Sequence, residues 1–337
     1  MNKTKTGRRD EWRRNKIDAE RQARESRKGQ QTEDLINTSE LGPEQPGRIA
    51  SHYGANFSVQ DTHGKHHLCV TRRNLPKLVC GDYVTWQAVN EYNGIIVALQ
   101  PRKTLLARPG YQQRLKPIAA NIDQILVVVA PQPSLDEDLI NRYLVAAALT
   151  HIPPVIVLNK VDLLTDEALQ ETQRRLHVYR QLGYAIVYAS TVHNHGLDEL
   201  LGRLAAKTSI FVGQSGVGKS SLIKAILPES SVRIGALSHA TGLGKHTTTV
   251  STLYTVSVDG AIIDSPGIRE FGLGHFEPAQ VAEGFVEFPQ FIHQCKFNDC
   301  SHHSEPGCAV RQAVASGAIQ KGRYESFLRL IASANRH

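Results

Sequence analysis

Residues 46–110 alternate apolar and polar positions in short runs, and this pattern predicts a small β-barrel. Turn-forming residues, such as those at 61–64 and the pair Asn93-Gly94, separate the runs. About five short strands of this kind are typical of an OB-type barrel, a fold that commonly binds single-stranded nucleic acid. The expected strands are 48–50, 57–59, 67–70, 83–86 and 94–97, and the basic residues expected on the surface are Arg72, Arg73, Lys77, Arg102, Lys103 and Arg108.

From residue 118 onward, apolar runs alternate with amphipathic segments. Repeated strand–helix units predict a mainly parallel sheet with helices on both faces, and such sheets bind ligands at the carboxyl ends of their strands. The expected strands are 125–130, 155–158, 186–189, 210–212, 251–258 and 261–263, and the expected helices are 135–149, 166–182, 197–206, 220–227 and, near the end of the chain, 323–333.

The 337 residues can hold two or three domains, and 41% hydrophobic and 21% charged residues are ordinary for a globular protein. We expect an arm at 1–45, the barrel at 46–110, the strand–helix domain at 111–276 and a mainly helical domain at 277–337. No apolar run approaches the ~20 residues that a membrane span requires. Because the N-terminus also lacks the apolar core of a signal peptide, we expect a cytoplasmic protein without membrane contact.

The net charge of +7 comes mostly from the arm, since residues 1–28 contain eleven Lys or Arg against five Asp or Glu. A basic segment of this kind favours a polyanionic partner, because its contact with phosphates releases counterions. The alternative is a solvated, disordered tail that has no partner.

Residues 208–221, TSIFVGQSGVGKSS, contain the strongest chemical signal in the chain. An apolar run leads into the pattern G-x4-G-K-S and a helical pattern follows, which is the strand–loop–helix setting of a phosphate-binding loop. The glycines let several N–H groups point into one concavity at the positive end of the helix. Lys219 would reach the outer phosphates and Ser220 would ligate Mg²⁺. The residues expected to contact the nucleotide are Gly213, Gln214, Ser215, Gly216, Val217, Gly218, Lys219, Ser220 and Ser221.

The tetrapeptide NKVD at 159–162 follows an expected strand and indicates guanine as the base. The carboxylate of Asp162 can accept two hydrogen bonds from guanine, and adenine lacks that pair of donors. A buried acceptor left unpaired is costly, so the site would discriminate between the bases. Asn159 and the stem of Lys160 would brace the loop and flank the base. The candidate for a second base-contacting loop consists of Ala189, Ser190 and Thr191.

The tetrapeptide DSPG at 264–267 resembles the DxxG motif of GTPases. Asp264 would hold Mg²⁺ through a water molecule, and the N–H of Gly267 would bond the γ-phosphate. The polar, glycine-containing loop at 242–249 suits a switch. One of its threonines should complete the Mg²⁺ shell, unless it is only a strand-edge residue. The candidates are Thr247, Thr248 and Thr249, and we select Thr248, so the expected Mg²⁺ ligands are Ser220, Thr248 and Asp264.

The order of the motifs differs from that in most GTPases, since NKVD and the candidate base loop precede the phosphate loop instead of following DxxG. This order predicts a circularly permuted P-loop GTPase domain that leads directly into the last domain, so that nucleotide state would move that domain. Ras-like proteins place a water-orienting Gln soon after DxxG, whereas this chain has Ile268. His246 in the switch loop is the candidate for this role, with an exposed loop histidine as the alternative. The expected catalytic residues are therefore His246, Lys219 and Thr248, with slow intrinsic hydrolysis and strong stimulation by a partner.

Three of the five cysteines lie within 295–308, in the spacing Cys-x4-Cys-x-His-x5-Cys. In a cytosolic chain this cluster suggests a metal more than a disulfide, and three sulfurs with one imidazole match a closed structural Zn²⁺ site. The alternative is a group of free cysteines in a small core. The expected ligands are Cys295, Cys300, His302 and Cys308, with His303 as the alternative nitrogen ligand.

Taken together, NKVD before the phosphate loop, GKHTTT and DSPG after it, and the flanking barrel and Cys/His cluster make residues 46–337 similar to the YjeQ family of GTPases. The resemblance implies an α/β chain with a circularly permuted P-loop GTPase domain between an N-terminal OB-fold barrel and a C-terminal zinc-binding domain. It implies a cytoplasmic enzyme that binds the 30S ribosomal subunit late in assembly, is activated by it and helps release ribosome-binding factor A. It also implies histidine-assisted hydrolysis at the position of His246. We expect a monomer whose partners are the 30S subunit and its 16S rRNA.

Three other functions remain as alternatives. A translation or signalling GTPase would share the nucleotide site but would not need the barrel, the Cys/His cluster and the arm. A P-loop kinase would need an acceptor pocket, and NKVD argues against it. A GTP-sensing, RNA-binding scaffold would keep the binding motifs and lose hydrolysis, which Ile268 in place of Gln allows.

Overall fold

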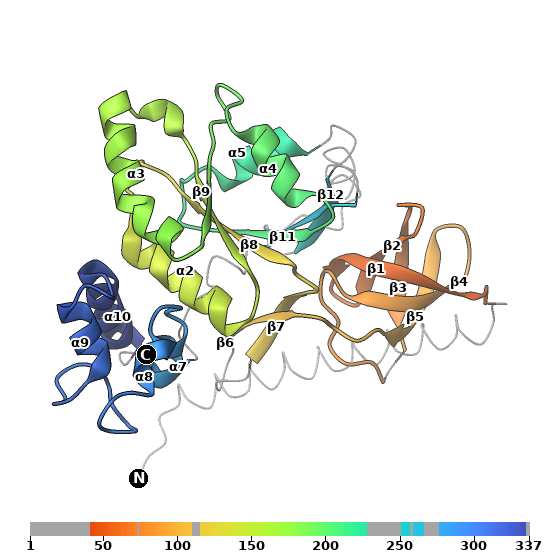
Figure 1. Ribbon diagram of the computed structural model, residues 1–337. Coiled ribbons are helices and arrows are strands. Elements are labelled where there is room, and N and C mark those ends of the chain that lie inside the picture. The colour runs from red at the N-terminus through yellow and green to blue at the C-terminus, as the bar shows by residue number, and fades with distance from the viewer. Residues whose placement is uncertain are drawn as a thin grey trace, which may run out of the picture. The chain divides into compact units, whose positions relative to one another are not determined.

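The computed structural model describes residues 41–72, 74–109, 115–227, 251–256, 259–265 and 276–334 (Figure 1). The chain forms two compact units. The first holds the described residues up to Leu78 together with Tyr83–Pro101, and the second holds Val79–Asp82 and the residues from Arg102 onward. Within these ranges, no helix has the length and apolar character that a membrane crossing demands.

The first unit contains a closed, five-stranded barrel. Strand β1 pairs with β2 on one side and with β4 on the other, and β3 pairs in parallel with β5, so the order β1-β2-β3-β5-β4 closes on itself. Ile49, Val59 and Trp86 are almost fully buried in its apolar core. All five expected strands are confirmed, and each is longer than the run that predicted it. Their bounds are β1 (Glu44–Tyr53), β2 (Asn56–Asp61), β3 (His66–Thr71), β4 (Tyr83–Ala88) and β5 (Asn93–Leu99).

The second unit is built on a mainly parallel sheet in the order β10-β9-β8-β11-β13-β12, in which only β12 runs antiparallel to its neighbour. Helices α2 and α3 lie on one side of this sheet and α4 and α5 on the other (Figure 1). The expected strand–helix architecture is confirmed. The bounds are β8 (Gln124–Val129), α2 (Glu137–Leu149), β9 (Pro154–Leu158), α3 (Asp166–Gln181), β10 (Ala185–Tyr188), α4 (Leu197–Leu204), β11 (Thr208–Val212), α5 (Lys219–Ile226), β12 (Thr252–Thr255) and β13 (Ala261–Asp264).

Capping residues set where two of these helices begin. Helix α2 starts at Glu137 because the Asp136 side chain accepts a hydrogen bond from the N–H of Leu139. Helix α3 starts in the same way behind Thr165. The sequence placed the first of these starts at residue 135, since apolar periodicity does not distinguish the helix from the loop that leads into it.

A two-stranded hairpin, β6 (Leu105–Pro109) and β7 (Leu115–Ala120), also belongs to the second unit and was not expected from the sequence. Pro109 and Pro117 lie within these strands, and proline weakens the sequence signal of a strand because it cannot donate to the ladder. Residues 79–82 join the same unit, where Cys80 bridges to Ala119. Asp82 forms an ion pair with Arg102 at 2.7 Å.

The C-terminal part of the second unit is helical, as expected. It contains α7 (Pro278–Glu283), α8 (Pro289–Ile292), α9 (Ala309–Ala315) and α10 (Lys321–Ala334). Phe285, Phe288 and Phe327 are fully buried and pack ring against ring at centroid distances of 4.9–5.6 Å. Helix α10 packs along α2, and an Arg329–Asp138 ion pair of 2.6 Å joins the two helices.

Candidate active site and metal centre

The phosphate-binding loop connects β11 to α5, in the setting that the sequence predicted. Gly213 has a φ of +141°, and a β-carbon there would lie 2.1 Å from the carbonyl oxygen of Val128, so only glycine is compatible with this close approach. The Lys219 ammonium donates to the carbonyl oxygens of Gly213 and Gln214, at 2.7 Å each. A cationic side chain and a helix N-terminus thus meet at one loop, which is the arrangement that binds phosphate.

Two residues of NKVD, which follows β9, form hydrogen bonds to the phosphate-binding loop. The amide nitrogen of Asn159, which is 1% exposed, donates to the carbonyl oxygen of Val217 at 2.8 Å. Lys160 adopts a left-handed conformation, with φ +60°, and its ammonium donates to the carbonyl oxygen of Gly216 at 2.7 Å. The end of β9 and the phosphate loop therefore form one connected structure.

Asp162 is held by the segment that follows β10. The Ser190 hydroxyl donates to the Asp162 carboxylate at 2.5 Å and accepts hydrogen bonds from the N–H groups of Val192 and His193. The backbone of the buried Ala189 pairs with the NKVD segment, since its carbonyl accepts from the N–H of Val161 at 3.2 Å. These contacts fix the orientation of the Asp162 carboxylate, the group that the sequence predicts to recognise the base.

Asp264 ends β13, so it lies at the same carboxyl edge of the sheet as the phosphate loop. The adjacent Ser265 is buried, and its hydroxyl lies 2.6 Å from that of Ser251. Gly267, His246 and Thr248, together with the alternatives Thr247 and Thr249, lie outside the described residues. The assignments made for them from the sequence stay predictions.

Some contacts of the site carry no sequence signature. The Lys160 ammonium lies 3.4 Å from the carbonyl oxygen of Gln132, in the loop after β8. Val192 and His193 take part through backbone N–H groups alone. Because any residue type supplies a backbone group, no residue pattern could have indicated these three positions.

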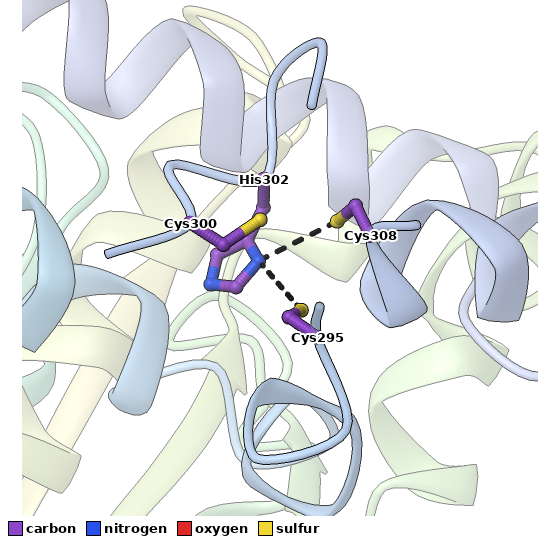
Figure 2. A group of neighbouring side chains, drawn as sticks. All are labelled: Cys295, Cys300, His302 and Cys308. Atoms are coloured by element: carbon purple, nitrogen blue, oxygen red, sulfur yellow. Dashed lines mark hydrogen bonds between the residues drawn. The ribbon is translucent and has the colours of Figure 1, made fainter. Parts of the chain in front are cut away.

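The Cys/His cluster forms a group that could hold a metal ion. The ligand atoms of Cys295, Cys300, His302 and Cys308 all lie within 4.8 Å of one another (Figure 2). The His302 Nδ1 atom lies 3.5 Å from the sulfur of Cys295 and 3.6 Å from that of Cys308. The alternative ligand His303 is exposed, and its N–H donates to Glu305.

Burial shifts the pKa values of two side chains in this cluster. It lowers the pKa of the His302 imidazole, which favours the neutral form that binds metals. Burial and the neighbouring thiols raise the pKa of Cys300 to about 12, so without a positive ion its thiol keeps its proton. A bound cation reverses this preference, because a coordinating thiol is deprotonated. The residues present therefore suit a metal ion.

Comparison with known proteins identifies the family. The family model described as RsgA GTPase matches residues 99–274. A "Small ribosomal subunit biogenesis GTPase RsgA" from Chromohalobacter salexigens is 48% identical over 335 residues, which cover 98% of each chain. The chain belongs to the RsgA GTPase family. Another member, from Hahella chejuensis, is 48% identical over 334 residues that cover 98% of this chain and 96% of the relative. As a member of the RsgA GTPase family, the protein is a GTP-hydrolysing enzyme.

Solved structures of similar proteins confirm the expected fold class. YjeQ from Thermotoga maritima matches with a TM-score of 0.73 at 31% identity, covering 88% of this chain and all of its own. YloQ, described as a circularly permuted GTPase, matches with a TM-score of 0.70 at 27% identity, covering 87% of this chain and 96% of its own. An RsgA-family fold with permuted GTPase domain, barrel and C-terminal Cys/His cluster is thus established.

Proposed function

We propose that this enzyme hydrolyses GTP on the small ribosomal subunit, acts late in the maturation of that subunit in the cytoplasm, and promotes release of ribosome-binding factor A. The printed name of its relatives, small ribosomal subunit biogenesis GTPase, supports the partner. The observation that carries the nucleotide assignment is the Ser190–Asp162 pair, which is fastened to the phosphate loop through Asn159 and Lys160. We propose a monomer that contacts the 16S rRNA of the subunit.

In the proposed nucleotide site, residues at different strand ends would bind different parts of GTP. Asp162 would accept the two guanine donors, with Ala189 and Ser190 completing the base contact. The loop from Gly213 to Ser221 would enclose the phosphates, with Lys219 neutralising their outer charge. Ser220, Asp264 and Thr248 would hold Mg²⁺, which on binding neutralises charge that develops on the phosphates. The N–H of Gly267 would contact the γ-phosphate.

The step that most depends on the partner is the orientation of the attacking water. Ile268 stands where Ras-like proteins have the water-orienting Gln, and a hydrocarbon side chain offers water neither a donor nor an acceptor. His246 would take this role once the subunit orders the switch loop. Hydrolysis by the isolated protein would then be slow, and the subunit would act as the activator.

We assign the C-terminal cluster to one structural Zn²⁺. Tetrahedral Zn²⁺ lies about 2.3 Å from sulfur and about 2.0–2.1 Å from nitrogen, which separates the two ligand atoms by about 3.6 Å. The separations of 3.5 and 3.6 Å from His302 Nδ1 to the sulfurs of Cys295 and Cys308 agree with this value. Four protein ligands leave no open coordination position, so the ion would stabilise this segment and take no part in hydrolysis.

The test is GTP hydrolysis by the purified protein alone and with purified 30S, 50S and 70S particles, using His246→Ala and, as a control, His177→Ala on the exposed surface of α3. We expect strong stimulation by 30S particles that His246→Ala abolishes and His177→Ala preserves. Stimulation that survives His246→Ala would remove the histidine from the mechanism. An absence of stimulation by every particle would overturn the ribosomal proposal and favour a GTP-sensing scaffold. Release of ribosome-binding factor A is tested by sedimenting subunits preloaded with it, with and without hydrolysis.

A further inference from the structure

The backbone of the metal ligand His302 has an unusual conformation. Its φ is +60°, in the left-handed region that is unfavourable for a residue with a β-carbon. The Tyr324 hydroxyl of α10 donates to the carbonyl oxygen of His302 at 2.7 Å. The His302 ring lies beside the Phe327 ring, one turn after Tyr324 along α10, at a centroid distance of 6.3 Å and an interplanar angle of 51°. One helix therefore holds both the backbone and the ring of the ligand.

Arg323, the residue before Tyr324, joins α10 to helix α2 of the GTPase sheet. Arg323 is 3% exposed and forms two hydrogen bonds with the Glu287 carboxylate, at 2.7 and 2.8 Å. Its third contact, at 2.6 Å, is the side-chain oxygen of Asn141 on α2, which also accepts from the Tyr179 hydroxyl on α3. A buried guanidinium without its partners would be strongly unfavourable, so this network allows few positions for α10.

Successive residues of an α-helix point about 100° apart, so Arg323 and Tyr324 project from different faces of α10. One face touches the metal ligand and the other touches α2. Helix α2 follows β8 and the loop whose Gln132 carbonyl lies beside Lys160 of the nucleotide site. Helix α10 thus connects the metal centre to the GTPase sheet.

We propose that Tyr324 is a positioning residue of the metal centre, and that α10 couples metal binding to docking of the C-terminal helices on α2. The Tyr324 hydroxyl stabilises the left-handed backbone that directs His302 Nδ1 toward Cys295 and Cys308. Metal binding in turn fixes His302 and so α10. Because few positions of α10 allow both the Tyr324 and the Arg323 hydrogen bonds to form, each contact favours the other. The inference concerns the metal centre and holds independently of the ribosomal partner.

The first test is the affinity for Zn²⁺ of the full chain, measured by competition with a chromophoric chelator for Tyr324→Phe. The matched control is Tyr184→Phe, because the buried hydroxyl of Tyr184 has no hydrogen-bond partner among the described residues. Loss of outer contacts to metal ligands lowers metal affinity about 10–100-fold, and we expect a loss in this range for Tyr324→Phe alone. Wild-type affinity in Tyr324→Phe would overturn the positioning role.

The second test needs no substitution and measures amide hydrogen exchange of the wild-type chain with Zn²⁺ bound and after chelation. Coupling predicts faster exchange after chelation in residues 321–334 of α10 and also in residues 137–149 of α2. The barrel strands serve as the internal reference and should exchange at the same rate in both states. Faster exchange confined to residues 295–308 would overturn the coupling through α10.

Discussion

Replacing Ser190 by alanine removes the hydroxyl that donates to the carboxylate of Asp162, the group proposed to recognise the base. Ser190 is 1% exposed, and its oxygen lies 2.5 Å from the Asp162 carboxylate. The substitution leaves Asp162 itself unchanged, so it tests the orientation of this carboxylate separately from its presence. We expect weaker binding of guanine nucleotides, because the base must then order the carboxylate itself.

The magnitude follows from this one contact. A hydrogen bond to a charged group contributes about 1.5–3 kcal/mol, and about 1.4 kcal/mol corresponds to a factor of ten in affinity, so we expect weakening of about 10–100-fold. The N–H groups of Val192 and His193 also lose their acceptor, but both residues are exposed and water can replace it. The effect should therefore come mainly from Asp162.

The assay is titration with fluorescently labelled GDP, followed by displacement with unlabelled GDP and ADP. Ser209→Ala is a matched control, since the fully buried Ser209 accepts a hydrogen bond from Gln124 at 2.8 Å at the other end of β11. We expect the control to lower the melting temperature and keep the affinity for GDP. If Ser190→Ala binds GDP as tightly as the wild type while remaining folded, Asp162 does not depend on Ser190 and the reasoning is refuted.

Three further predictions concern the loop, the barrel and the metal centre. Gly213→Ala should abolish GTP binding in a nucleotide titration and lower the melting temperature, because its β-carbon would lie 2.1 Å from the Val128 carbonyl oxygen; unchanged binding would contradict the loop geometry. Burial lowers the pKa of His66 below its usual 6.5, so the unfolded chain binds the proton more readily than the folded chain. The contribution of neutral His66 to the free energy of unfolding should therefore be fully present above pH 6.5 and be lost as the pH falls from 6.5 toward the folded-state pKa. Urea unfolding on both sides of pH 6.5 should show a smaller pH dependence in His66→Gln, and an unchanged slope would exclude His66 as its source. Cys308→Ser should reduce the Zn²⁺ content measured by mass spectrometry from about one ion per chain to nearly none, because a closed site needs all four ligands; full retention would contradict the ligand set.

The sequence predicted the elements and motifs of this protein better than the contacts between them. The phosphate loop and NKVD are local patterns at strand ends, and parallel pairing brings such ends to one edge. The Asn159–Val217 contact joins residues 58 positions apart, so it depends on strand order. Nothing in the sequence indicated that Arg323 is buried, because a charged residue in a helical pattern normally lies on the solvent-exposed face.

The permuted order gives the C-terminal helices two connections to the GTPase sheet. The chain leaves the proposed nucleotide site at Asp264 and continues into these helices. They pack back on α2, the first helix of the sheet. The Arg323–Asn141 contact closes this arrangement across 182 residues. If nucleotide state moves the C-terminal helices, as the motif order predicts, the motion must either carry α2 with them or break a buried charged network. Breaking the network is costly, since leaving a buried guanidinium without partners destabilises a protein by about 3–5 kcal/mol. We therefore expect α2 to move with the C-terminal helices. Hydrogen exchange in the GDP and GTP states tests this, since altered protection in residues 321–334 without a change in residues 137–149 would show that the network opens.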